Sequence, residues 1–216
     1  DAPVSLTQAQ LDEINDYFDC ERQELDGAHG HFGVNGFFTS SYDDVRDLNL
    51  KEFLKYFCEE VERGVSEAEF AQLKEIWTNL ASVATVSEMP VPITRYPAAA
   101  VEAVLREFAG IGLEDLRDMQ EPFSGYAYLA DTDAFYTTTS DYAPGYFICT
   151  SGQVTGDTAT LYGEYGARVL TLRRVDDHWY IQSLQDTRPE PELNETPTVE
   201  STQAADAQAA QSDPLP

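Results

Sequence analysis

The sequence predicts an α+β fold in which N-terminal helices pack on one face of a C-terminal antiparallel β-meander. Helix-start signals recur in the first half of the chain, and apolar residues there follow the helical period. After Pro122 the period changes to two, with runs of Tyr, Thr, Phe and Val between turn residues. Helices followed by strands are typical of α+β domains.

Three helices are predicted by capping boxes, in which a capping side chain precedes Glu or Gln by three residues. The capping residues are Thr7, Asn49 and Ser66. An apolar pair at the spacing of a hydrophobic staple flanks each box, which strengthens the prediction. The apolar faces that follow are Leu11, Ile14 and Phe18; Phe53, Leu54 and Phe57; and Phe70, Leu73, Trp77 and Leu80.

A fourth helix is predicted between Pro97 and Gly110, because Pro favours the first helical turn and Gly the position after the last. A short helix is expected to follow at residues 113–119. Three prolines within residues 89–97 predict an extended connector that is not a central strand, since Pro cannot donate a ladder hydrogen bond. The buried face of the fourth helix is expected to be Val101, Val104, Leu105 and Phe108.

Six strands are predicted in the second half, and the last two form the clearest hairpin. If Asp176 and Asp177 form its turn, Arg174 pairs with Trp179. One face of the hairpin is then apolar and the other polar, which predicts a sheet covered on one side. The strands are expected at residues 126–130, 134–139, 146–151, 158–162, 167–175 and 178–184. The apolar face holds Leu170, Leu172, Trp179 and Ile181, and the polar face Thr171, Arg173, Tyr180 and Gln182.

The chain of 216 residues is expected to form a single domain over residues 1–187 and a disordered tail over residues 188–216. The tail is acidic and rich in Pro, Ala and Gln, and its only sizeable apolar residues are Leu193, Val199 and Leu215. Such a segment buries too little apolar surface to offset the entropy of ordering.

The charge of the chain excludes two classes of partner. With 39 acidic and 13 basic side chains, the formal net charge is −26. Nucleic acids and anionic membrane surfaces would both be repelled, so we expect no binding to either. No apolar run in the sequence approaches the roughly 18–20 residues of a membrane span.

The three cysteines lack the spacing of a metal or redox motif, and their odd count argues against a disulfide framework. Cys20 and Cys58 each lie just beyond a helical run, so one bridge between them is one interpretation. The other, slightly favoured, is that Cys20, Cys58 and Cys149 are buried free thiols.

The sequence lacks the familiar catalytic motifs of hydrolases and phosphate-binding enzymes. His29 and His31, close to Glu24 and Asp26, are the best candidate metal ligands. Solvated histidines in a glycine-rich loop are the favoured interpretation, so we expect no metal and no cofactor. The acids at residues 43–47 could attract calcium, but acids at the start of a helix are favoured there.

Tyrosines on the first predicted strands are the candidate ligand-binding residues. Tyr126, Tyr128 and Tyr142 could stack on sugar rings or anchor a protein partner if they are exposed. The alternative is that alternate tyrosines fill the core beneath the helices.

Several segments together resemble a known family. They are residues 6–18, 35–42 with the acidic helix start at 43–49, 97–108, 112–116, 128–129 and the hairpin 171–183. Over residues 5–185 the chain resembles an uncharacterised family of extracytoplasmic, lipoprotein-type proteins of Gram-positive anaerobic bacteria. The resemblance implies a secreted or cell-surface protein, anchored through a segment that would precede Asp1. It transfers no functional residues.

We therefore predict a secreted or cell-surface binding domain that is not an enzyme and whose partner is a cell-surface protein or glycan. The alternative is an extracellular hydrolase that uses paired carboxylates or a metal held by His29 and His31. A third interpretation is a small-molecule pocket between the helices and the sheet.

Overall fold

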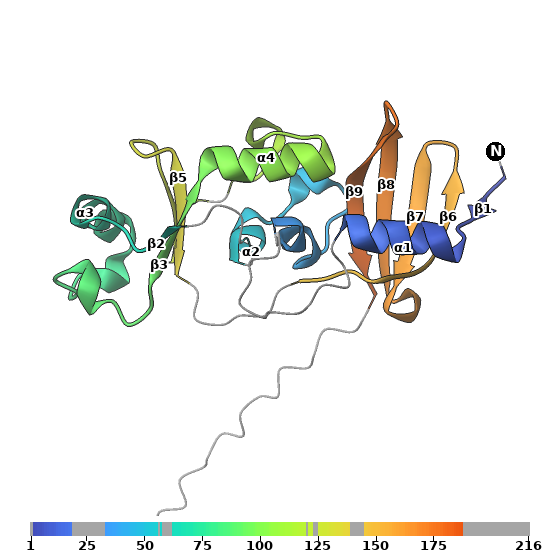
Figure 1. The fold of residues 1–216 in the computed structure, drawn as a ribbon. Helices are drawn as coiled ribbons and strands as arrows, with labels where there is room; N and C mark the ends of the chain where they lie inside the picture. Colours follow the sequence, from blue (N-terminus) through green and yellow to red (C-terminus); the bar gives the residue numbers. More distant parts are fainter. Residues whose placement is uncertain are drawn as a thin grey trace, which may run out of the picture.

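The computed structural model describes residues 2–18, 33–55, 57, 62–119, 121–122, 125–138 and 145–187. These residues form four α-helices, several short 3-10 turns and two antiparallel sheets (Figure 1). The α+β class is confirmed, with helices concentrated in the first half and a strand meander at the C-terminal end. The predicted tail, residues 188–216, lies outside the described residues.

The four helices begin where their capping signals predict. They are α1 (Gln8–Tyr17), α2 (Leu50–Lys55), α3 (Glu67–Ile76) and α4 (Ala98–Ala109). Thr7 and Ser66 each form a complete capping box, and the Asn49 side chain accepts a hydrogen bond from the Glu52 N–H at 3.1 Å. Gly110 ends α4 in the left-handed conformation. The short helix expected at residues 113–119 is one 3-10 turn, Leu113–Asp115.

The large sheet has the strand order β1-β6-β7-β8-β9. Asp176 and Asp177 form the predicted turn, both with positive φ, and Arg174 pairs with Trp179 as expected. A bulge after Thr171 shifts the pairing of the last strand and increases the local twist of the hairpin. The strands are β1 (Val4–Ser5), β6 (Cys149–Thr155), β7 (Thr158–Gly163), β8 (Arg168–Val175) and β9 (His178–Asp186).

The first two predicted strands belong to a separate small sheet. It has the order β2-β3-β5-β4, with β2 at Glu62–Arg63, β3 at Ile93–Pro97, β4 at Tyr126–Leu129 and β5 at Ala134–Thr138. The prediction that residues 89–97 hold no central strand is wrong, because β3 lies between β2 and β5. Two prolines of the 89–97 segment precede β3, and the third, Pro97, is the last residue of the strand. The β2 strand pairs only with Thr94 and Arg95. The missing donors therefore interrupt no ladder between β2 and β3.

Two apolar cores lie on opposite faces of the small sheet. In the smaller core, α3 packs on one face through Phe70, Leu73 and Trp77. In the larger core, α2 and α4 lie between the other face and the large sheet, and α1 lies across the large sheet itself (Figure 1). Helices therefore cover one face of the meander, as predicted. The buried residues on that face of the large sheet are Ala159, Leu161, Leu170, Leu172, Ile181 and Leu184.

The described helices are all short. The longest of them, α4, has 12 residues, and none combines the length and the apolar character needed to cross a bilayer.

Candidate binding site

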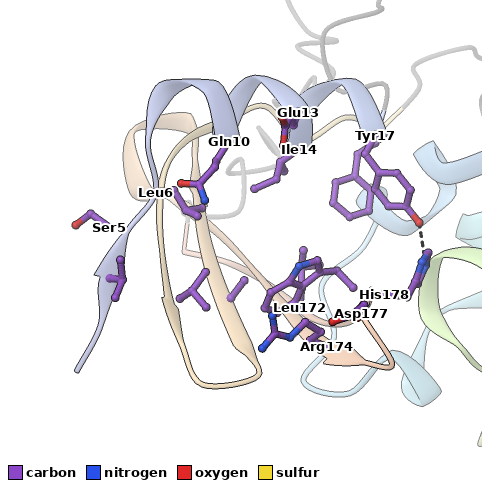
Figure 2. Close-up of a pocket in the computed structure, with 15 residues that line it drawn as sticks. Ser5, Leu6, Gln10, Glu13, Ile14, Tyr17, Leu172, Arg174, Asp177 and His178 are labelled. Atoms are coloured by element: carbon purple, nitrogen blue, oxygen red, sulfur yellow. Dashed lines mark hydrogen bonds between the residues drawn. The ribbon is translucent and has the colours of Figure 1, made fainter. Parts of the chain in front are cut away.

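A groove of about 550 Å³ lies between α1 and the covered face of the large sheet (Figure 2). Its size falls in the range of about 300–1,000 Å³ that is typical of small-molecule sites. The β1 segment borders one end, and the tip of the β8–β9 hairpin borders the other. The helix contributes Gln10, Glu13, Ile14 and Tyr17, and the sheet contributes Val154, Ala159, Leu172 and Trp179.

The groove exists because α1 is fixed over the sheet at both ends. Near its C-terminal end, the Asn15 side chain hydrogen-bonds both backbone groups of Cys149, at 2.8 and 3.0 Å. At the other end, β1 pairs with β6, and the Leu6 N–H donates to the Gly152 carbonyl at 2.9 Å. The small side chain of Ala159, in β7, lines the groove.

The floor of the groove is apolar and its rim is polar. Ala159 and Leu172 are buried, while Trp179 is partly exposed. Two residues that line the groove, Val4 and Tyr17, are among the exposed large hydrophobic residues. An apolar surface that is open to solvent inside a concave site is typical of ligand binding.

One end of the groove is formed by a contact between Tyr17 and His178. The Tyr17 hydroxyl lies 3.0 Å from His178 Nε2 (Figure 2). The same nitrogen lies 3.0 Å from the Glu107 carbonyl oxygen. Burial, followed by the negative charge of Glu107, raises the pKa of Tyr17 to about 12. The phenol therefore keeps its proton at neutral pH and is a hydrogen-bonding group rather than a nucleophile.

The basic side chain of the groove is already paired. The Arg174 guanidinium lies over the Trp179 ring, 5.4 Å from its centroid, and forms an ion pair with Asp157 at 3.1 Å. Glu13 and Asp177 also line the groove, and both are exposed. Within the described part of the chain, neither carboxylate has an ion-pair partner.

The tyrosines singled out from the sequence lie elsewhere. Tyr126 is only 1% exposed, and its hydroxyl donates to the Met119 carbonyl at 2.8 Å, so it is a core residue of the small sheet. Tyr128 is 41% exposed, and its hydroxyl donates to Asp133 at 2.7 Å. Of these two tyrosines only Tyr128 is exposed, so they do not form a shared exposed surface. Tyr142 lies outside the described residues.

The remaining candidates from the sequence fall into two groups. His29, His31, Cys20 and Cys58 lie outside the described residues, so the metal and disulfide interpretations stay predictions. Cys149 is a buried free thiol, and burial raises its pKa to about 11. Across the described ranges, no three His, Cys, Asp or Glu side chains gather closely enough to hold a metal ion.

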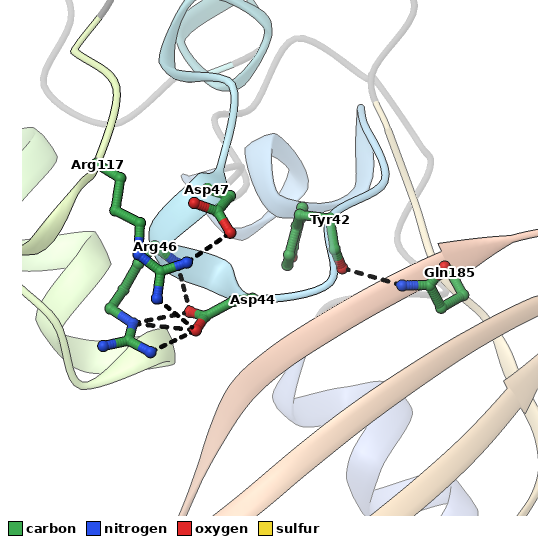
Figure 3. A network of polar contacts seen from close by, with 6 residues as sticks. All are labelled: Tyr42, Asp44, Arg46, Asp47, Arg117 and Gln185. Atoms are coloured by element: carbon green, nitrogen blue, oxygen red, sulfur yellow. Dashed lines mark hydrogen bonds and ion pairs between the residues drawn. The ribbon is translucent and has the colours of Figure 1, made fainter.

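Two of the acids at residues 43–47, Asp44 and Asp47, belong to a structural network (Figure 3). Asp44 caps a 3-10 turn by accepting from the Arg46 N–H at 2.9 Å, and it also pairs with the Arg46 and Arg117 side chains. Arg117 reaches Asp47 at 2.7 Å. The hydrogen bond from Arg46 holds the pKa of Asp44 well below its usual range. These arginine contacts argue against a calcium site. The acids also lie before α2 rather than in its first turn, where Asn49 provides the cap, so the helix-start interpretation is correct only for the 3-10 turn.

The residues that form the groove were only partly visible in the sequence. The hairpin register places Trp179 on the covered face of the sheet, which was a usable signal. No sequence signal indicated Tyr17 and His178, because they are 161 positions apart and meet only in the folded protein.

No family model matches the chain, and neither the curated proteins nor the solved structures include a match.

Proposed function

We propose that the protein is a binding domain whose site is the groove beneath α1, and that its ligand is a small molecule with an apolar body. The observation that carries this proposal is the cavity of about 550 Å³, with its apolar floor, which includes Trp179, and its end at Tyr17. Because α1 is tied down at both ends, the site is formed before a ligand enters, which lowers the entropic cost of binding.

The ionisation of titratable groups in the described residues, in the groove and elsewhere, supports binding over hydrolysis. The raised pKa values of Tyr17 and Cys149 keep both groups protonated at neutral pH, so neither is an activated nucleophile. Asp44 and Glu69 have lowered pKa values. In Glu69 the burial that would raise the pKa is outweighed by hydrogen bonds from Tyr136 and Ser66 and by the charge of Arg95. A general acid would instead need a raised carboxyl pKa.

We further propose that the domain works outside the cytoplasm. The support for this location is the resemblance noted in the sequence to extracytoplasmic, lipoprotein-type proteins. Protease treatment of intact cells of the source organism tests it: digestion of the protein under conditions that spare cytoplasmic proteins is expected, and protection would contradict the proposal.

The groove can be tested with a neutral solvatochromic dye such as Nile red. We expect saturable binding to the wild-type protein. Ala159→Leu places a larger side chain in the floor and Ile14→Trp a larger one beneath the helix, so both should weaken binding at least tenfold. Ala81→Leu is the matched control, because Ala81 is exposed on a turn beside the smaller core.

The proposal fails if the wild-type protein does not bind the dye. It also fails if both groove variants, folded as judged by circular dichroism, bind the dye as tightly as the Ala81→Leu control.

A further inference from the structure

The charges around the groove indicate what kind of ligand it takes. Its charged lining residues are Glu13, Arg174 and Asp177. Asp157 neutralises Arg174 through the ion pair at 3.1 Å, so the two lining carboxylates remain uncompensated among the residues that the structure describes. Both belong to the rim, one on α1 and the other at the tip of the hairpin (Figure 2). A ligand with an anionic group would meet repulsion at this rim.

The aromatic residues of the groove also favour a positively charged ligand over an anionic one. The faces of tyrosine and tryptophan rings carry partial negative charge and attract cations. Trp179 already shows this behaviour, since the Arg174 guanidinium lies over its ring. The negative charge of Glu107 acts on the Tyr17 hydroxyl, and the Glu107 carbonyl oxygen lies next to His178. The ring faces of Tyr17 and Trp179, together with the negative charge of Glu107 just outside the groove lining, therefore favour positive charge.

The charge of the whole protein acts in the same direction. A formal net charge of −26 produces a negative potential that raises the local concentration of cations and lowers that of anions. This long-range effect and the two rim carboxylates both favour a ligand with a positive charge.

We propose that the ligand of the groove is an amphipathic organic cation. Its apolar body lies on Ala159, Leu172 and Trp179, and its ammonium group is held by the rim carboxylates of Glu13 and Asp177. This inference rests on the proposed function and adds the chemical class of the ligand. An exposed ion pair contributes little by itself, so the apolar body provides most of the affinity and the charge provides the selectivity.

Three probes that share one apolar body test the inference: 4-phenylbutylamine, 4-phenylbutan-1-ol and 4-phenylbutyrate. Binding can be followed by the emission of Trp179 and by calorimetry. The other tryptophan, Trp77, is 1% exposed in the smaller core, so its emission should stay constant. We expect the amine to bind most tightly, the alcohol about fivefold more weakly, and the butyrate most weakly.

The rim carboxylates can be tested one at a time. Glu13→Gln and Asp177→Asn are each expected to weaken binding of the amine about two- to fivefold and to leave binding of the alcohol unchanged. Asp12→Asn is the matched control, since it removes the same charge from α1 at a residue that does not line the groove. Added salt should weaken binding of the amine only.

Two failures can be distinguished. If the alcohol or the butyrate binds as tightly as the amine, or if Asp12→Asn has the same effect as the rim variants, the cation inference is wrong and the binding groove stands. If none of the three probes binds, and the neutral dye does not bind either, the proposed function is wrong as well.

Discussion

The side chain of Asn15 hydrogen-bonds both backbone groups of Cys149, although the two residues are 134 positions apart. Asn15 Oδ1 accepts from the Cys149 N–H at 2.8 Å, and Asn15 Nδ2 donates to the Cys149 carbonyl at 3.0 Å. Cys149 lies where an irregularity interrupts the pairing of β6 with β7. The amide of Asn15 therefore takes the place of a neighbouring strand and joins α1 to the sheet.

Replacing Asn15 should destabilise the fold. Asn15→Ala leaves two buried backbone groups without partners, at about 1–3 kcal/mol each, so we expect a loss of about 2–6 kcal/mol in the free energy of unfolding. Asn15→Asp keeps the acceptor for the Cys149 N–H but buries a carboxylate against the Cys149 carbonyl oxygen, so it should cost at least as much as the alanine change at neutral pH. Asp16→Ala, at an exposed position of the same helix, is the control. Equal urea midpoints for Asn15→Ala and the control would show that this contact contributes nothing.

The buried thiol of Cys149 should make stability depend on pH in the alkaline range. Its pKa is raised from 9.0 to about 11, so the folded protein holds this proton more tightly than the unfolded chain. The associated stability is complete below pH 9 and is lost as the pH rises toward 11, by about 2–3 kcal/mol in total. Cys149→Ala should show a shallower decline of the unfolding free energy over this range. Identical slopes for the two proteins would contradict the prediction.

Asp44 should show the opposite dependence, at acid pH. Hydrogen bonds and ion pairs with Arg46 and Arg117 lower its pKa, so its contribution is complete above about pH 4 and is lost as the pH falls below that value. The partners are partly exposed, so solvent and salt weaken the pairs.

At pH 7 we expect Asp44→Asn to cost about 1 kcal/mol in urea unfolding, through the weakened cap and ion pairs. The difference from the wild-type protein should shrink at pH 2.5. Asp131→Asn, at an exposed turn, should have no measurable effect at either pH. A difference for Asp44→Asn that stays constant from pH 7 to pH 2.5 would show that the carboxylate charge is not involved.

The features that followed from the sequence are local ones. The caps at Thr7 and Ser66 and the turn at Asp176 depend on a few neighbouring residues, and their side-chain chemistry is strong enough to define them. The division into two sheets depends instead on β3 pairing with β5, about 40 residues further along the chain. Strand periodicity cannot reveal which strands pair, so six similar strands indicate a single meander.

The groove was not predictable for a related reason. The sequence allows a pocket between helices and sheet, but it assigns no residue to one. The floor of the groove combines Ala159 with Leu172 and Trp179, and its roof comes from the other end of the chain. Whether such an interface is filled or open depends on how high α1 lies above Ala159. The contact between Asn15 and Cys149 sets that height, and nothing in the sequence near either residue signals it.

Gly110 provides a test of how α4 meets the large sheet. Its φ is +66°, and a Cβ at this position would lie 3.0–3.2 Å from atoms of the Tyr180 ring. Gly110→Ala therefore combines backbone strain with crowding against a ring in β9. Gly64 has a φ of +84°, and a Cβ there would have no other atom within 4 Å, so Gly64→Ala has the strain alone.

We expect Gly64→Ala to cost about 1 kcal/mol in urea unfolding and Gly110→Ala about 2 kcal/mol or more. The difference between the two variants measures the packing of Tyr180 against the end of α4. Tyr180→Ala in the Gly110→Ala background removes the ring and should abolish the coupling between the two positions. If both glycine variants lose the same free energy, the ring yields without cost, and the end of α4 is not held in place by β9.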